Sequence, residues 1–151
     1  MLKTKIPPPV YMLLSAGLMW LLNQTLPLYH WLGRPWNAFG LIFIGAAIFL
    51  DAWSLWLFFR AKTTFNPMNP SKTSYLVTSG LYCISRNPMY FGLLLMLIGW
   101  ALYLGSISPI LLLPLFVWLL TKMQIEPEEK ILIQKFGQEY KDYQQRVRRW
   151  I

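Results

Sequence analysis

The sequence predicts an all-α integral membrane protein of about four transmembrane helices, and three observations support this. Hydrophobic residues make up 56% of the 151-residue chain and charged residues only 13%, whereas soluble domains carry about 25% charged residues. The charged residues are absent from long continuous stretches instead of being thinned out evenly. The basic residues gather in the polar segments that separate and follow these stretches. An ordinary soluble domain is therefore excluded.

A helix that crosses a bilayer needs about 20 mainly apolar residues. The first candidate ends in the polar run Asn23-Gln24-Thr25, and the second contains a single charge, Asp51. Lys3 and Lys5 ahead of the first candidate suggest a signal peptide, but three prolines interrupt it and no small-residue cleavage site follows. We therefore expect a retained first span. The four expected spans are residues 10–28, 36–59, 89–104 and 108–122.

The last two spans are predicted to form a tight helical hairpin. Residues 89–120 carry no charge and are too long for one ordinary span, and Gly105 to Pro109 in their middle are turn residues. A single tilted helix is the alternative. With a hairpin, every Lys and Arg except Arg34 falls on one side of the membrane, which the positive-inside rule assigns to the cytoplasm. This topology also accounts for the net charge of +8 without a nucleic-acid partner.

Two segments, residues 61–88 and 123–151, are then expected on the cytoplasmic side. The first is rich in turn residues and longer than a simple connection, which is typical of functional loops. In the second, Glu126-Pro127-Glu128-Glu129 predicts a helix start, with proline and acidic residues in the first turn. An apolar stripe through Leu132 and Phe136 predicts an amphipathic C-terminal helix, lying on the membrane surface or folded against the loop.

Isolated residues say less about chemistry. One histidine, His30, and one cysteine, Cys83, make a metal site implausible and an intramolecular disulfide impossible. Asp51 inside a span is costly, so it requires a polar contact. A bond to a neighbouring helix and a role in a site are both open.

Each remaining polar residue also has an explanation without chemistry. Asn87 and Pro88 fit the N-cap and first residue of the third span. Tyr90 fits an interfacial aromatic and Arg86 a topology-setting charge. The acids at 128 and 129 fit the positive end of a helix dipole.

Three motifs nevertheless follow in a fixed order through the second half of the chain. They are Leu76-Val77-Thr78-Ser79-Gly80-Leu81-Tyr82, then Arg86-Asn87-Pro88-Met89-Tyr90-Phe91-Gly92, then Glu128-Glu129 with Phe136-Gly137-Gln138-Glu139-Tyr140 and Tyr143. The predicted hairpin separates the second motif from the third. This ordered set resembles the isoprenylcysteine carboxyl methyltransferase family and its phospholipid methyltransferase relatives, in particular their small bacterial members.

The resemblance implies a methyltransferase that uses S-adenosylmethionine, sits in a bacterial inner membrane with its active site facing the cytoplasm, and needs no metal. Aromatic faces suit the cofactor's sulfonium, and a carboxylate suits its ammonium or ribose hydroxyls. Arg86 and Glu128 are expected to order the site, with no general base assigned. The resemblance implies a cofactor site formed by Leu76, Val77, Tyr82, Asn87, Pro88, Met89, Tyr90 and Glu128.

Two positions depart from the family pattern. Asn87 replaces the usual histidine and cannot accept a proton. Gln124, the candidate substrate residue, stands where carboxyl-methylating members have an arginine. The acceptor therefore stays open among a prenylated cysteine, an isoprenoid acid, a phospholipid amine and a small lipophilic thiol or phenol. A sterol-type reductase, which needs more spans, and a non-catalytic membrane scaffold are the alternatives from other classes.

Overall fold

The structure is a computed structural model that describes residues 6–60 and 75–151. Lys3, Lys5 and the first half of the predicted cytoplasmic loop, residues 61–74, lie outside the described residues. Within the described ranges every named element is helical, and two isolated β-bridges are the only extended pairings. The predicted all-α class is confirmed.

In residues 6–60 and 75–151, six α-helices follow one another, with short 3-10 and π segments between several of them. The α-helices are α1 (Pro8–Thr25), α2 (Gly40–Arg60), α3 (Pro88–Leu104), α4 (Leu112–Leu120), α5 (Glu126–Phe136) and α6 (Gln138–Arg146). The 3-10 helices are η1 (Trp36–Phe39), η3 (Gly80–Cys83) and η4 (Ser108–Leu111), and the π-helix is η5 (Thr121–Ile125).

Two helical runs, Trp36–Leu57 and Ser108–Phe136, are long and apolar enough to cross a membrane, and Pro88–Leu104 is a shorter apolar helix. The outer faces of the bundle expose large hydrophobic side chains, Leu13, Phe49 and Trp118 among them. A soluble protein would bury such faces, whereas lipid solvates them. These helices indicate a membrane protein, and the four-span topology stays a prediction.

The turn predicted between the third and fourth spans is present. The backbone N–H of Gly105, which closes α3, donates to Ala101 O at 3.1 Å, and Gly105 has φ +77°. This left-handed conformation suits glycine because it has no Cβ. The Gly105 carbonyl accepts from the N–H groups of Trp31 and Leu32, which ties the α1–α2 connection to the same end of the bundle.

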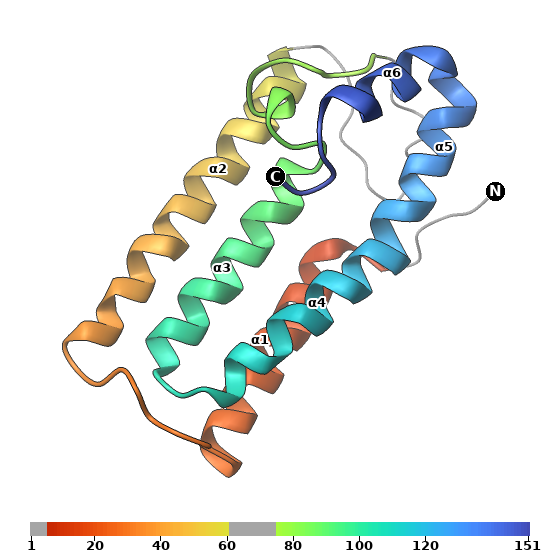
Figure 1. The fold of residues 1–151 in the computed structure, drawn as a ribbon. Helices are drawn as coiled ribbons and strands as arrows, with labels where there is room; N and C mark the ends of the chain where they lie inside the picture. The colour runs from red at the N-terminus through yellow and green to blue at the C-terminus, as the bar shows by residue number, and fades with distance from the viewer. Residues whose placement is uncertain (1–5, 61–74) are drawn as a thin grey trace.

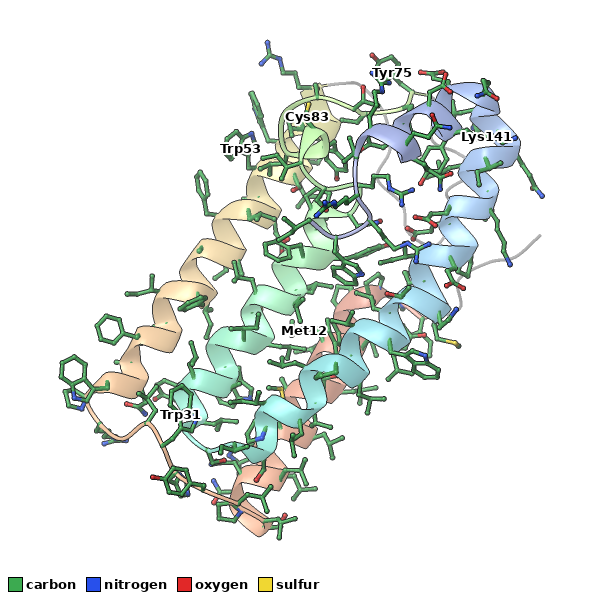
Figure 2. The ribbon with its side chains drawn as sticks, viewed as in Figure 1. Met12, Trp31, Trp53, Tyr75, Cys83 and Lys141 are labelled. Atoms are coloured by element: carbon green, nitrogen blue, oxygen red, sulfur yellow. The ribbon has the colours of Figure 1, made fainter. Side chains whose placement is uncertain are left out.

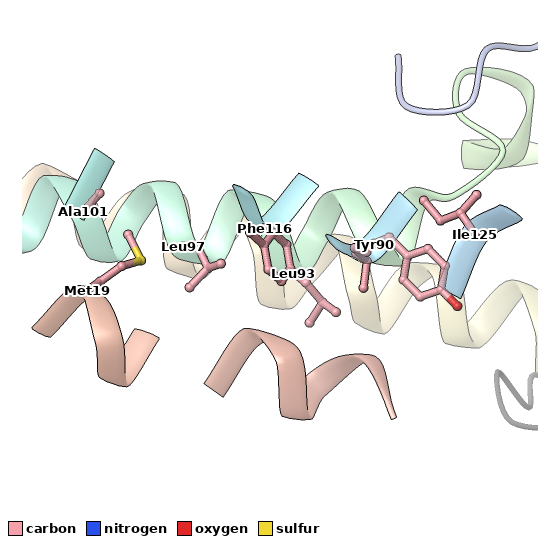
Figure 3. Packing of buried hydrophobic residues seen from close by; sticks show 8 residues of the cluster. Met19, Tyr90, Leu93, Leu97, Ala101, Phe116 and Ile125 are labelled. Carbon is pink, nitrogen blue, oxygen red and sulfur yellow. The ribbon is translucent and has the colours of Figure 1, made fainter. Parts of the chain in front are cut away.

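The helices pack around α3, as Figure 1 shows: α2 lies along one side of it and α1 packs against α3 and α4. Met19 of α1, Leu97 of α3 and Phe116 of α4 are almost fully buried where these helices meet. Figure 3 shows that this cluster runs along α3 from Ala101 to Tyr90. Tyr90 is thus the polar end of an otherwise apolar core.

The helix α5 begins at Glu126 with Pro127 and acidic residues in its first turn, as predicted, but it continues the preceding helix and has no free N-terminus. The chain stays helical from Ser108 to Phe136, because η5 connects α4 to α5 without a break. The acids at 126–129 therefore lie inside a continuous helical run. The break comes at Gly137, with φ +55°, after which α6 turns back and the last residues reach the beginning of α3 (Figure 1). Of the two placements predicted for the tail, the structure has it folded against the loop.

Candidate functional site

The polar groups of the three motifs gather at one end of the bundle. Figure 2 shows Tyr75, Cys83 and Lys141 at this end and Trp31 at the other. Here the segment that precedes α3, the helices α5 and α6, and the C-terminal residues meet. The hairpin produces this arrangement, since it returns the chain to the end at which α3 began.

The entry into α3 is formed as the sequence predicts, with Asn87 as N-cap and Pro88 as first helical residue. The Asn87 side chain does not cap the helix. Its Nδ2 instead donates to Arg149 O at 2.9 Å. The N–H groups of Met89 and Tyr90, in the first turn, have no acceptor within the helix and give this end a partial positive charge.

The central polar contact joins α3 to α5. The Tyr90 hydroxyl donates to Glu128 Oε1 at 2.6 Å, and Gln124 Nε2 donates to the same oxygen at 2.7 Å. Both donors meet Oε1, and the Glu128 residue as a whole is half-buried. Two neutral donors leave the carboxylate charge uncompensated, so this carboxylate suits a cation or a hydroxyl group.

Gln124 lies in the π-helix η5 and is fully buried. The wider π turn places it next to Glu128 at the point where α4 becomes α5. Single π turns of this kind are found frequently at functional sites. A sequence pattern of period 3.6 does not reveal such a turn.

The next residue, Glu129, makes a different set of contacts. Arg149 approaches it with two donors, Nε to Oε1 at 3.1 Å and Nη2 to Oε2 at 2.7 Å. Arg86 Nη1 lies 3.0 Å from Oε1 in a buried ion pair that is not aligned as a hydrogen bond. Hydrogen bonding to Glu129 raises the pKa of the Arg149 guanidinium. The two neighbouring acids are therefore in opposite settings, one held by two cations and the other by neutral groups.

Three buried tyrosines, Tyr82, Tyr140 and Tyr143, lie at the same end of the bundle. The Tyr143 hydroxyl donates to the carbonyl of Tyr82 at 2.6 Å, and Leu76 packs with Tyr140, Tyr143 and Val147. Burial raises the pKa of the Tyr82 phenol, and the Tyr143 phenol and two nearby carboxylates raise it further. The Tyr82 phenol therefore remains neutral.

Asp51 lies on α2 opposite Gly92 of α3. A Cβ atom at Gly92 would overlap the Asp51 carboxylate, so the glycine makes room for it. Its Oδ1 is buried without a hydrogen-bond partner among the described residues. The polar contact predicted for Asp51 is therefore not made by this oxygen.

Comparison with known proteins indicates the family to which this chain belongs. A family model described as phospholipid methyltransferase matches residues 36–139, which include α2 to α5 and the segment that leads into α3. The chain belongs to the phospholipid methyltransferase family. No solved structure gives a significant match.

Individual relatives agree with the family. Protein-S-isoprenylcysteine O-methyltransferase of Schizosaccharomyces pombe is 34% identical over 51% of this chain and 33% of its own length. The mouse enzyme of the same name is 38% identical over 59% of this chain and 32% of its own length. The chain thus matches about a third of the length of these methyltransferases. An "uncharacterized protein" of Haemophilus influenzae is 44% identical over 42% of this chain and its whole length.

In the structure, the predicted site residues of this chain fall into groups. Tyr90, Gln124 and Glu128 come together at one carboxylate. Arg86 and Asn87 contact Glu129 and the C-terminal segment instead. The other predicted residues lie around them: Leu76, Val77, Tyr82 and Pro88 are buried, and Met89 is half-buried.

Sequence reasoning did not single out Glu129, Tyr143 or Arg149 as site residues. The first two belong to the quoted motifs, so a signal was present. Arg149 lies in a basic run at the end of the chain, beyond the residues that the family model matches. Nothing in its spacing points to Glu129.

Proposed function

We propose that the chain is an S-adenosylmethionine-dependent methyltransferase that acts on a lipophilic acceptor at the cytoplasmic face of a bacterial inner membrane. The observation that carries the proposal is the cluster of Tyr90, Gln124 and Glu128. It offers a carboxylate without a paired cation at the position where the family motifs meet. Membership of a methyltransferase family rests on the sequence matches described above.

The residues present fit this cofactor. The Glu128 carboxylate suits its ammonium or ribose hydroxyls, and the Tyr82 and Tyr90 rings suit its sulfonium. The first N–H groups of α3 suit its carboxylate. The bound cofactor would supply an electrophilic methyl group on sulfur. Arg86, held by Glu129, has an ordering role in this proposal because it is committed to a protein carboxylate.

The chain's own contribution is positional. Methyl transfer between two bound reactants gains most from their alignment and from exclusion of water. Four spans would deliver a lipid-like acceptor from the bilayer, and a soluble cofactor would enter from the cytoplasm. Asn87 donates to a backbone carbonyl and Gln124 to Glu128, so neither is assigned as a proton acceptor.

The acceptor class has two candidates. The names of the relatives favour a prenylated cysteine carboxylate. A phospholipid amine or a small lipophilic N-, O- or S-nucleophile is favoured by Gln124 in place of a cationic residue. Incubating membranes with methyl-labelled cofactor separates them, because a carboxyl methyl ester releases its label in base and a methylated amine does not.

Cofactor binding is tested by titrating the detergent-purified chain with S-adenosylhomocysteine. Wild type is expected to bind, and Glu128→Gln to weaken binding about tenfold or more, as loss of a charge-assisted contact predicts. Glu139, an exposed residue of α6, supplies the matched control, and Glu139→Gln should bind like wild type. Absence of binding by wild type would refute the proposal and favour a non-catalytic scaffold.

Topology is tested separately with reporter fusions at the C-terminus. A cytoplasmic reporter supports the four-span arrangement. A periplasmic C-terminus would place α5 and α6 on the wrong side for a cytoplasmic cofactor and would overturn the localisation.

A further inference from the structure

The last residues of the chain form a strap across the entry to α3. The N–H of Arg86 donates to Arg148 O at 3.0 Å, and Asn87 Nδ2 donates to Arg149 O at 2.9 Å. Ser85 forms an isolated parallel bridge with Arg148. We call residues 147–150 the C-terminal strap. It is held by the same backbone that leads into the first turn of α3.

Two side chains anchor the strap in the hydrophobic clusters. Val147 is buried with Leu76, Tyr140 and Tyr143. Trp150 packs against the core cluster that contains Tyr90. Because it joins the cluster of Leu76, Tyr140 and Tyr143 to the core cluster around α3, the strap is an integral part of this end of the molecule.

Arg149 connects the strap to α5. Its planar guanidinium meets both oxygens of Glu129, and this fork geometry defines direction as well as attraction. Arg86 approaches the same carboxylate from the α3 side. Glu129 is thus held between two segments that are far from it in sequence.

The contact also constrains the neighbouring acid. Successive residues of a helix point about 100° apart, so fixing Glu129 fixes the rotation of α5 that directs Glu128 toward Tyr90. We propose that Arg149 is a positioning residue which, through Glu129, aligns Glu128 and the entry to α3 for cofactor binding. This inference rests on the proposed function, and it assigns no contact between Arg149 and the cofactor.

The test compares Arg149→Ala, Arg149→Lys and Arg148→Ala in the full-length protein, with S-adenosylhomocysteine as the probe. Arg148 is exposed and contributes its backbone carbonyl to the strap, so Arg148→Ala is the matched control. Arg149→Ala should raise the dissociation constant about tenfold, as coupling within one ion-pair network predicts. Arg149→Lys should recover part of the affinity because it keeps the charge without the fork, and Arg148→Ala should bind like wild type.

A second comparison separates positioning from stability. Titrations are run well below each variant's melting temperature, and Glu129→Gln is combined with Arg149→Ala. Because both residues act through one contact, the double variant should bind no worse than the weaker single variant.

Equal affinities for Arg149→Ala and Arg148→Ala, with wild type binding and Glu128→Gln impaired, would overturn the positioning role and leave the proposed function intact. Additive losses in the double variant would also overturn it. If wild type itself does not bind, the proposed function fails and this inference fails with it.

Discussion

Replacing Tyr90 with phenylalanine tests whether the contact between α3 and α5 holds the site together. The substitution removes one hydroxyl and leaves the ring in the core cluster. The lost hydrogen bond is short, 2.6 Å, and ends on a carboxylate. Hydrogen bonds to charged groups contribute about 1.5–3 kcal/mol net. Gln124 still donates to the same oxygen, so we expect the free energy of unfolding to fall by about 1.5–2 kcal/mol, the lower part of that range.

The assay is equilibrium unfolding in mixed detergent micelles, followed by tryptophan fluorescence. Tyr90→Phe is measured alone and together with Glu128→Gln. Because the two residues share one bond, the cycle should show a coupling of at least about 1 kcal/mol. Tyr103→Phe is the control: Tyr103 lies on the same helix with its side chain 37% exposed, and its hydroxyl loss should change stability by less than about 0.5 kcal/mol.

Two results would refute this reasoning. If the cycle is additive within about 0.5 kcal/mol, the hydroxyl and the carboxylate do not interact in the folded protein. If Tyr103→Phe costs as much as Tyr90→Phe, the loss reflects a general effect of removing a hydroxyl from α3.

Three further predictions concern the turn after α3 and the buried tyrosines of the site. Gly105→Ala should lower the free energy of unfolding by at least about 1–2 kcal/mol, because an L side chain is strained at φ +77° and its Cβ would overlap the Leu32 carbonyl oxygen. The same substitution at Gly17, where no atom crowds a new Cβ, should be neutral or stabilising, and equal effects would contradict this argument. Tyr143→Phe should cost about 1 kcal/mol through loss of its bond to the Tyr82 carbonyl, visible as a lower melting temperature, and an unchanged one would count against that bond. Burial, with Glu129 adding to it, raises the pKa of Tyr140 to about 12, so its contribution to stability is full below about pH 10, the unfolded value, and is lost as pH rises toward 12. Melting temperatures measured across this window should fall less steeply for Tyr140→Phe than for wild type, and identical slopes would oppose the assignment.

Several features were predictable because their causes are local. The apolar runs predict the long helices, since any such stretch must bury or lipid-solvate its backbone polar groups by forming a helix. Pro88 marks the start of α3, because proline has no N–H to donate. Gly105 marks its end. The ordered motifs indicate the family for a similar reason, since they are stretches of sequence and require no fold.

Other features depend on the relative placement of helices, which no local pattern specifies. The sequence does not reveal that the Asn87 amide donates to a carbonyl in the C-terminal strap, and its place in a cofactor site stays a prediction. The acids at 126–129 lie in the first turn of α5 as predicted, but the π turn η5 keeps the chain helical before them. That turn changes the rotation of every residue after it, and so decides what the paired glutamates face.

The candidate site shows the same division. The sequence by itself determined an all-α membrane protein with a hairpin, and it supplied Tyr90 and Glu128 as candidate site residues. Only the tertiary structure decided that Glu128 meets two neutral donors and Glu129 two guanidinium groups. The physical reason is that adjacent helical side chains point in different directions, so their partners are set by packing between segments distant in the chain.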